Sequence, residues 1–189
     1  MAINLSKGDR FDLNKGLSKV GVGLGWNPNE GESQFDFDLD ASSFMLGTNK
    51  KLPLDEFFVF YNNQQSPDGA VASSGDDKTG GSSDGDDETL SVDLAKVDKR
   101  VQEIVFTVTI HDAEKRKQSF GQVRKSFIRI YNAMDGVEIA KYELDEDFSV
   151  ETAIEFGRLY RNGEQWKFEA MGIGYKGGLE FFLNKYAIS

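Results

Sequence analysis

The sequence contains no cysteine, only one histidine, and no run of about 20 apolar residues. The lack of cysteine excludes disulfides, thiolate zinc sites and thiol catalysis. The lack of a long apolar run leaves no candidate transmembrane helix. Residues 1–7 also lack the apolar segment of a secretory signal. Together these absences predict a soluble, cytoplasmic protein.

The single histidine, His111, carries no catalytic signature. It is followed by Asp112, but no motif supplies a nucleophile that a His–Asp pair could activate. We therefore predict a structural or outer-shell role for His111, and a protein that is not an enzyme.

Basic residues are also scarce, because 22 Lys and Arg face 32 Asp and Glu, for a net charge of −10. This balance argues against nucleic-acid binding, which needs a basic surface to neutralise phosphates. Two segments hold most of the excess: residues 66–89 have a net charge of −6, and Asp36, Asp38 and Asp40 add −3. The negative charge is therefore local.

What the sequence does have is strand signals. Residues 19–26 alternate larger apolar residues with small ones, and residues 35–40 alternate apolar residues with aspartate. Residues 56–61 and 103–110 are aromatic and β-branched runs, typical of buried strands. The aspartates of residues 35–40 are expected on one face, either as the exposed face of an amphipathic strand or as part of a cation site.

Two hairpins are marked by their turns. Asp135-Gly136 separates residues 128–131 from 137–142, and Asn162-Gly163 separates residues 152–161 from 165–173. Helical segments are expected only near residues 112–121 and 178–186. We predict one mainly β domain over residues 1–189: a β-sandwich of two mostly antiparallel sheets with a few short helices.

Residues 64–89 are unlike the rest, being rich in acids, glycines and serines with little that is apolar. This composition fits a solvated, disordered loop as well as it fits a calcium site. Calcium takes six to eight oxygen ligands, and glycines let the backbone present carbonyls to an ion. The candidate oxygen donors are Asp36, Asp38, Asn62, Asn63, Asp68, Gly69, Asp76, Thr79, Asp84, Asp86, Asp87, Glu88 and Asp112.

An EF-hand does not explain these acids. Asp36, Asp38 and Asp40 match its first acidic positions, but Ala41 stands where glycine is required and Gly47 where the closing glutamate belongs. Any calcium site here is therefore of another type.

Motifs along the whole chain resemble the TerD family of tellurium-resistance and bacterial stress proteins. They include Val22-Gly23-Leu24-Gly25-Trp26, Phe37-Asp38-Leu39-Asp40-Ala41-Ser42, Phe60-Tyr61-Asn62-Asn63, the segment from Gly75 to Glu88, Thr109-Ile110-His111-Asp112-Ala113 and Phe156-Gly157-Arg158-Leu159-Tyr160-Arg161. The resemblance implies a β-sandwich that binds two calcium ions through a long acidic loop. This sequence departs from the family pattern at Asp77, where asparagine is usual, and in the spacer Gly81-Ser82-Ser83.

The resemblance also implies a stress-response protein that binds partners rather than catalyses a reaction. Other tellurite-resistance proteins and the inner membrane face are the partners that it suggests. Two alternatives stay open on the residues. One is a magnesium- or manganese-dependent phosphohydrolase whose basic groups come from Arg116, Lys117, Arg124 and Lys125. The other is an assembly subunit with incidental calcium.

Overall fold

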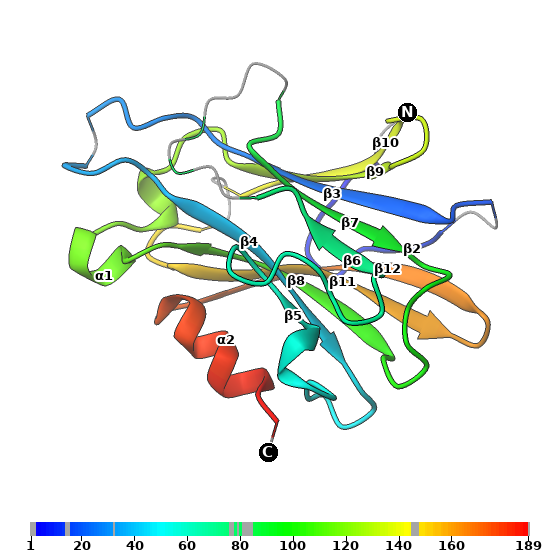
Figure 1. The fold of residues 1–189 in the computed structure, drawn as a ribbon. Helices are drawn as coiled ribbons and strands as arrows, with labels where there is room; N and C mark the ends of the chain where they lie inside the picture. The colour runs from blue at the N-terminus through cyan, green and yellow to red at the C-terminus, as the bar shows by residue number, and fades with distance from the viewer. Residues whose placement is uncertain are drawn as a thin grey trace.

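The computed structural model describes residues 3–13, 16–31, 33–75, 78, 80, 85–144 and 148–188. Over this part of the chain, the strands form two six-stranded sheets that lie one above the other, as Figure 1 shows. The predicted mainly β fold, two largely antiparallel sheets with a few short helices, is confirmed.

The first sheet, sheet A, is antiparallel except at one edge, where β1 runs parallel to β10. Its strand order is β1 (Ile3–Asn4), β10 (Glu138–Glu143), β9 (Phe127–Asn132), β3 (Lys19–Gly25), β7 (Glu88–Asp93) and β6 (Val71–Ser73).

The second sheet, sheet B, is antiparallel throughout. Its strand order is β2 (Arg10–Asp12), β12 (Gln165–Tyr175), β11 (Ala153–Asn162), β8 (Glu103–Ile110), β4 (Leu39–Leu46) and β5 (Phe58–Val59). Large side chains such as Phe37, Phe106, Phe156 and Phe168 are fully buried. Each such side chain contributes about 1.5–3 kcal/mol to the free energy of unfolding.

Both predicted hairpins are present, β9 with β10 and β11 with β12. Gly136 and Gly163 have φ angles of 74° and 65°, which are left-handed values that favour glycine. The turn residues therefore fix these two connections as the sequence predicts.

The helices are short: α1 (Ala113–Arg116), α2 (Gly178–Tyr186) and the 3-10 turns η1 (Asp55–Phe57) and η2 (Phe120–Gln122). Figure 1 shows α2, in red, beneath sheet B on the face turned away from sheet A. There its Phe182 and Tyr186 rings lie 6.0 and 5.0 Å from the ring of Phe44. None of the helices in the described ranges has the length and apolarity to cross a membrane.

The strand predicted at residues 35–40 is wrong in its first half. Phe35 is half exposed, Asp38 and Asp40 are buried, and β4 begins only at Leu39. The reason is that strand pairing begins only at Leu39, and a side chain holds the residues before it. The Gln118 side chain donates hydrogen bonds to the carbonyls of Phe35 and Asp36 at 2.9 and 3.1 Å.

Two further predictions need correction. Residues 56–61 are not one strand: Asp55–Phe57 forms a 3-10 turn that places Phe57 in the core, and β5 covers only Phe58–Val59. The segment 64–89 is not one continuous loop either, because its Val71–Ser73 stretch forms β6 against β7. Burial of Ala70 and Val71 offsets the entropy of ordering this part.

Candidate metal site at the acidic end of the sandwich

Several strand termini meet at one end of the sandwich. The first residue of β4 pairs with the last residue of β8, as Leu39 with Ile110. In sheet A, the first residue of β7, Glu88, pairs with Leu24 near the end of β3. Five acids surround these termini, and we call this region the acidic end: Asp38, Asp40, Asp86, Asp87 and Glu88.

Three of these carboxylates are buried, since Asp38, Asp40 and Glu88 are only 7%, 5% and 4% exposed. Glu88 links the two sheets, because its Oε2 accepts a hydrogen bond of 2.8 Å from the backbone N–H of Ala41 in β4. Buried carboxylates are costly unless they are hydrogen-bonded, paired with cations or bound to metal. The acidic end therefore gathers carboxylates whose burial depends on the hydrogen bonds and charges around them.

Some positive charge is present at moderate distance. Nη1 of Arg116 is 3.7 Å from the Asp38 carboxylate, and Nδ1 of His111 is 3.9 Å from the Asp40 carboxylate. The backbone N–H of His111 donates to the Asp38 carbonyl at 2.8 Å. His111 thus lies against the acidic end, as an outer-shell group would, but its role stays a prediction.

Asp86 is held by Arg129 of β9. The guanidinium donates two hydrogen bonds of 2.7 Å to the carboxylate, and the bond to Asp86 raises the pKa of Arg129 above its ordinary value. The carboxylate lies over Gly23 of β3, where an added Cβ would come within 2.4 Å of Asp86 Oδ2. The small residue at position 23 therefore makes room for this ion pair.

Asp87 and Trp26 connect β7 to β3. Asp87 accepts a hydrogen bond of 2.8 Å from the Trp26 backbone N–H and donates its own N–H to the Leu24 carbonyl at 2.8 Å. The Trp26 indole donates in turn to the Phe37 carbonyl at 2.9 Å. These bonds fix the position of the chain directly before β7, which begins at Glu88.

Other predicted ligands lie around this end but are more exposed. Asp112 follows β8 and has a left-handed φ of 50°, and its carboxylate lies 3.7 Å from His111 Nε2. Asp36 and Asn62 are exposed. The Asn63 amide donates to the carbonyls of Glu56 and Phe58 at 3.0 and 2.7 Å, so it closes the turn after β5.

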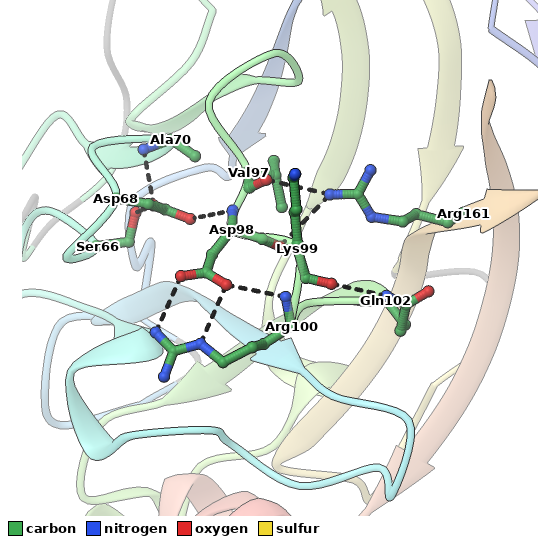
Figure 2. Close-up of polar contacts among 9 residues, drawn as sticks. All are labelled: Ser66, Asp68, Ala70, Val97, Asp98, Lys99, Arg100, Gln102 and Arg161. Carbon is green, nitrogen blue, oxygen red and sulfur yellow. Dashed lines mark hydrogen bonds and ion pairs between the residues drawn. The ribbon is translucent and has the colours of Figure 1, made fainter. Parts of the chain in front are cut away.

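Asp68 and Gly69 are not brought to the acidic end. They precede β6, whose Val71 pairs with Val92 near the far end of β7. Figure 2 shows the Asp68 carboxylate accepting hydrogen bonds from the Ser66 hydroxyl and from the N–H groups of Ala70 and Asp98. The strand rise of about 3.3 Å per residue separates the two ends of β7 by roughly 16 Å.

The remaining predicted ligands, Asp76, Thr79 and Asp84, lie outside the described residues. Within the described ranges, no group of three His, Asp or Glu side chains is arranged closely enough to hold a metal ion. Of residues 76–84, the structure describes only Lys78 and Gly80.

Sequence reasoning missed three contributors. Asp40 was visible in the aspartate series but absent from the predicted ligands, although it is among the buried carboxylates. Arg129 and Trp26 come from β9 and the end of β3, far along the chain from Asp86 and Asp87. Their parts depend on strand pairing, which no local pattern shows.

Known proteins resemble this chain over its full length. The TerD domain profile matches residues 1–186. "Tellurium resistance protein TerD" of Serratia marcescens is 49% identical over 100% of this chain and 99% of its own length, and "General stress protein 16U" of Bacillus subtilis is 47% identical over 100% and 98%. A Streptomyces coelicolor homologue of the telluride resistance protein has the same fold, with a TM-score of 0.74 at 20% identity over 92% of this chain and 100% of that one. The chain belongs to the TerD family of tellurium-resistance and stress-response proteins.

Proposed function

We propose that this protein is a calcium-binding stress-response protein that acts by binding rather than by catalysis. The observation that carries the proposal is that two buried carboxylates from different sheets, Asp38 next to β4 and Glu88 in β7, lie at the same end of the sandwich. Asp86 and Asp87, which directly precede Glu88, bind Arg129 and the Trp26 N–H at this end. Calcium suits a set made only of oxygen donors, because it takes six to eight of them in a flexible geometry.

The candidate ligand atoms are all oxygens, the type of atom that calcium binds. Asp38, Asp87 and Glu88 would supply carboxylate oxygens from the described residues. Asp76, Asp84 and the Thr79 carbonyl would complete the six to eight oxygens that calcium takes. Asp112 and Asn62 lie at the rim, where they could serve a second ion. Asp86, held by Arg129, would anchor the segment.

Calcium would act here by offsetting charge repulsion in the acidic segment and so ordering it. Because the ion binds the native state, it would also raise the free energy of unfolding. The ordered segment would then present a surface to a partner in the cytoplasm, either another stress protein or the inner membrane face. The names of the relatives support the stress role, and none of the quoted names states a catalytic activity.

Calorimetric titration of the metal-stripped protein with calcium, in millimolar magnesium, tests the proposal. Glu88→Gln keeps the hydrogen bond to Ala41 but removes a charge, so we expect calcium affinity to fall on the order of tenfold or more. The matched control is Glu164→Gln, an exposed glutamate in the β11–β12 turn at the opposite end of the sandwich, and it should bind as the parent does.

Equal affinity in the parent, Glu88→Gln and Asp38→Asn proteins would contradict the site. Magnesium-dependent turnover of a phosphoester, lost in Asp38→Asn, would contradict the non-catalytic proposal instead. The two outcomes are distinguishable because one concerns affinity and the other concerns product formation.

A further inference from the structure

A cleft of about 990 Å³ opens on the α2 side of sheet B, between the end of β8, α1 and the first half of α2. Its size is near the upper end of the range for pockets that hold small molecules. Asp40 and Thr109 line it from the sheet, and Val150, Leu179 and Leu183 line it from the surrounding chain. Of these five residues only Asp40 also belongs to the acidic end, and the calcium proposal gives it no role as a ligand.

The sheet side of the cleft is polar and buried. Asp40 and Thr109 are paired in register across β4 and β8, and they are 5% and 1% exposed. The Thr109 hydroxyl has no hydrogen-bond partner among the described residues. The next polar pair along these strands, Ser42 and Thr107, has buried hydroxyls in the same condition. Of these three hydroxyls, only that of Thr109 belongs to a residue that lines the cleft. An unsatisfied buried hydroxyl is costly, so Thr109 would gain from a ligand that donates a hydrogen bond to it.

The charge of the cleft favours a cation. Its acids are Asp40, Asp112, Glu114 and Glu180, against the two lysines Lys115 and Lys176. Lys115 lies 4.0 Å from the Asp112 carboxylate. An anion would normally be drawn to the N-terminus of α2. The N–H groups of Gly177 and Gly178 instead donate to the Thr152 hydroxyl, at 3.2 and 3.3 Å.

The mouth of the cleft is apolar. Val150 and Leu183 are 56% and 39% exposed, and Leu179 lies one helical turn before Leu183 on the same face of α2. Such a surface suits an aliphatic stem that carries a charged head, because the stem packs on apolar groups while the head reaches polar ones.

We propose that this cleft binds a primary ammonium group on an aliphatic stem. The ammonium would donate to the Asp40 carboxylate and the Thr109 hydroxyl, and the stem would lie along Leu179 and Leu183. An ammonium brings three donors and no acceptor, which matches this set of acceptors. The same chemistry is found in a free diamine or polyamine and in a lysine side chain of a partner.

The test is a chemical-shift titration of the isotopically labelled, calcium-saturated protein with 1,5-diaminopentane. For a ligand of seven heavy atoms we expect a dissociation constant on the order of millimolar. Saturable shifts should centre on Thr109, Ile110 and Leu183. Thr109→Val, which removes the hydroxyl at nearly constant shape, should weaken binding about tenfold. The control Thr48→Val changes an exposed threonine and should bind as the parent does.

Three outcomes would overturn the proposal: no saturable shift, equal affinity in Thr109→Val, or equally tight binding of 1-pentanol, which would indicate a merely apolar pocket. A parallel titration with Nα-acetyl-lysine amide, which keeps the side-chain ammonium, distinguishes a free amine from the lysine of a partner. Calcium titration of Thr109→Val separates this proposal from the calcium one, since we expect its calcium affinity to be unchanged. Its free energy of unfolding should be equal or higher, because a buried unpaired hydroxyl is replaced by a methyl group.

Discussion

At the scale of single residues, the glycines of β3 decide what can lie over sheet A. An added Cβ would meet the Tyr131 ring at Gly21, the Asp86 carboxylate at Gly23 and the Phe127 ring at Gly25, all within 2.6 Å. Asp86 approaches the strand only because position 23 has no side chain. The geometry of the acidic end therefore depends on a residue that carries no functional group.

Gly23→Ala should displace Asp86 and break its two hydrogen bonds to Arg129. We expect a loss of about 1–3 kcal/mol in the free energy of unfolding, typical of overpacking, together with weaker calcium binding. Urea unfolding and calorimetry measure the two effects. Gly16→Ala is the control, because an added Cβ there meets no atom within 4 Å and its φ angle is not left-handed. Equal effects of the two substitutions would contradict the steric argument.

The contribution of Asp98 to stability can be tested by changing the pH. Its side-chain hydrogen bonds with Arg100, seen in Figure 2, lower the pKa of Asp98 to about 2. Since the folded pKa lies below the unfolded value of about 3.9, the pair stabilises the fold above that value. The contribution is lost as the pH falls through about 2.

Asp98→Asn should therefore lower the free energy of unfolding at neutral pH by at most about 1 kcal/mol, since the pair is partly exposed. The free energy of unfolding of the variant should also fall less than that of the parent as the pH decreases from 4 to 2. Urea unfolding across this pH range measures both. If the free energy of unfolding fell equally in the variant and the parent over this range, other carboxylates would determine the pH dependence.

At the scale of elements, α2 is fastened to sheet B by a buried charge. Glu155 of β11 is fully buried and accepts hydrogen bonds from Lys185, Tyr175 and Tyr186. Burial, followed by the charge of Glu155, raises the pKa of Tyr186. Burial lowers the pKa of Lys185, but its bonds to Glu155 and Tyr175 raise it more, so that it lies above the ordinary value. The lysine thus stays charged and neutralises Glu155.

Lys185→Met should leave Glu155 without its cation and lower the free energy of unfolding by about 2 kcal/mol. This is below the usual range for a broken buried pair because the ammonium is partly exposed and two tyrosines still donate. Adding Glu155→Gln should recover part of the loss. A double-mutant cycle in urea measures the coupling, and a coupling near zero would contradict this role of the ion pair.

Elements marked by local signals could be predicted, and those fixed by distant partners could not. β8 matches the predicted residues 103–110 because its run of β-branched and aromatic side chains is continuous. β4 and β6 differ from prediction because burial across the sandwich, not alternation, decides them. The acids at strand ends were visible in the sequence. Their convergence needed the pairing of Leu39 with Ile110 and of Leu24 with Glu88.

At the scale of the whole molecule, the charged groups form two different arrangements in separate places. Around Asp68, Asp98 and Arg161, carboxylates and guanidinium groups tie loops together through backbone hydrogen bonds (Figure 2). At the acidic end, carboxylates from both sheets are gathered beside a segment of further acids. The first arrangement stabilises the sandwich by itself, whereas we expect the second to be stabilised by a cation.

The most direct test of the calcium proposal is a thermal melt of the metal-stripped protein with and without calcium, in millimolar magnesium. A free calcium concentration 100 times the dissociation constant stabilises the native state by about 2.7 kcal/mol. We therefore predict that calcium raises the melting temperature by about 5 °C or more, and that magnesium alone does not. Identical melts with and without calcium would contradict the account.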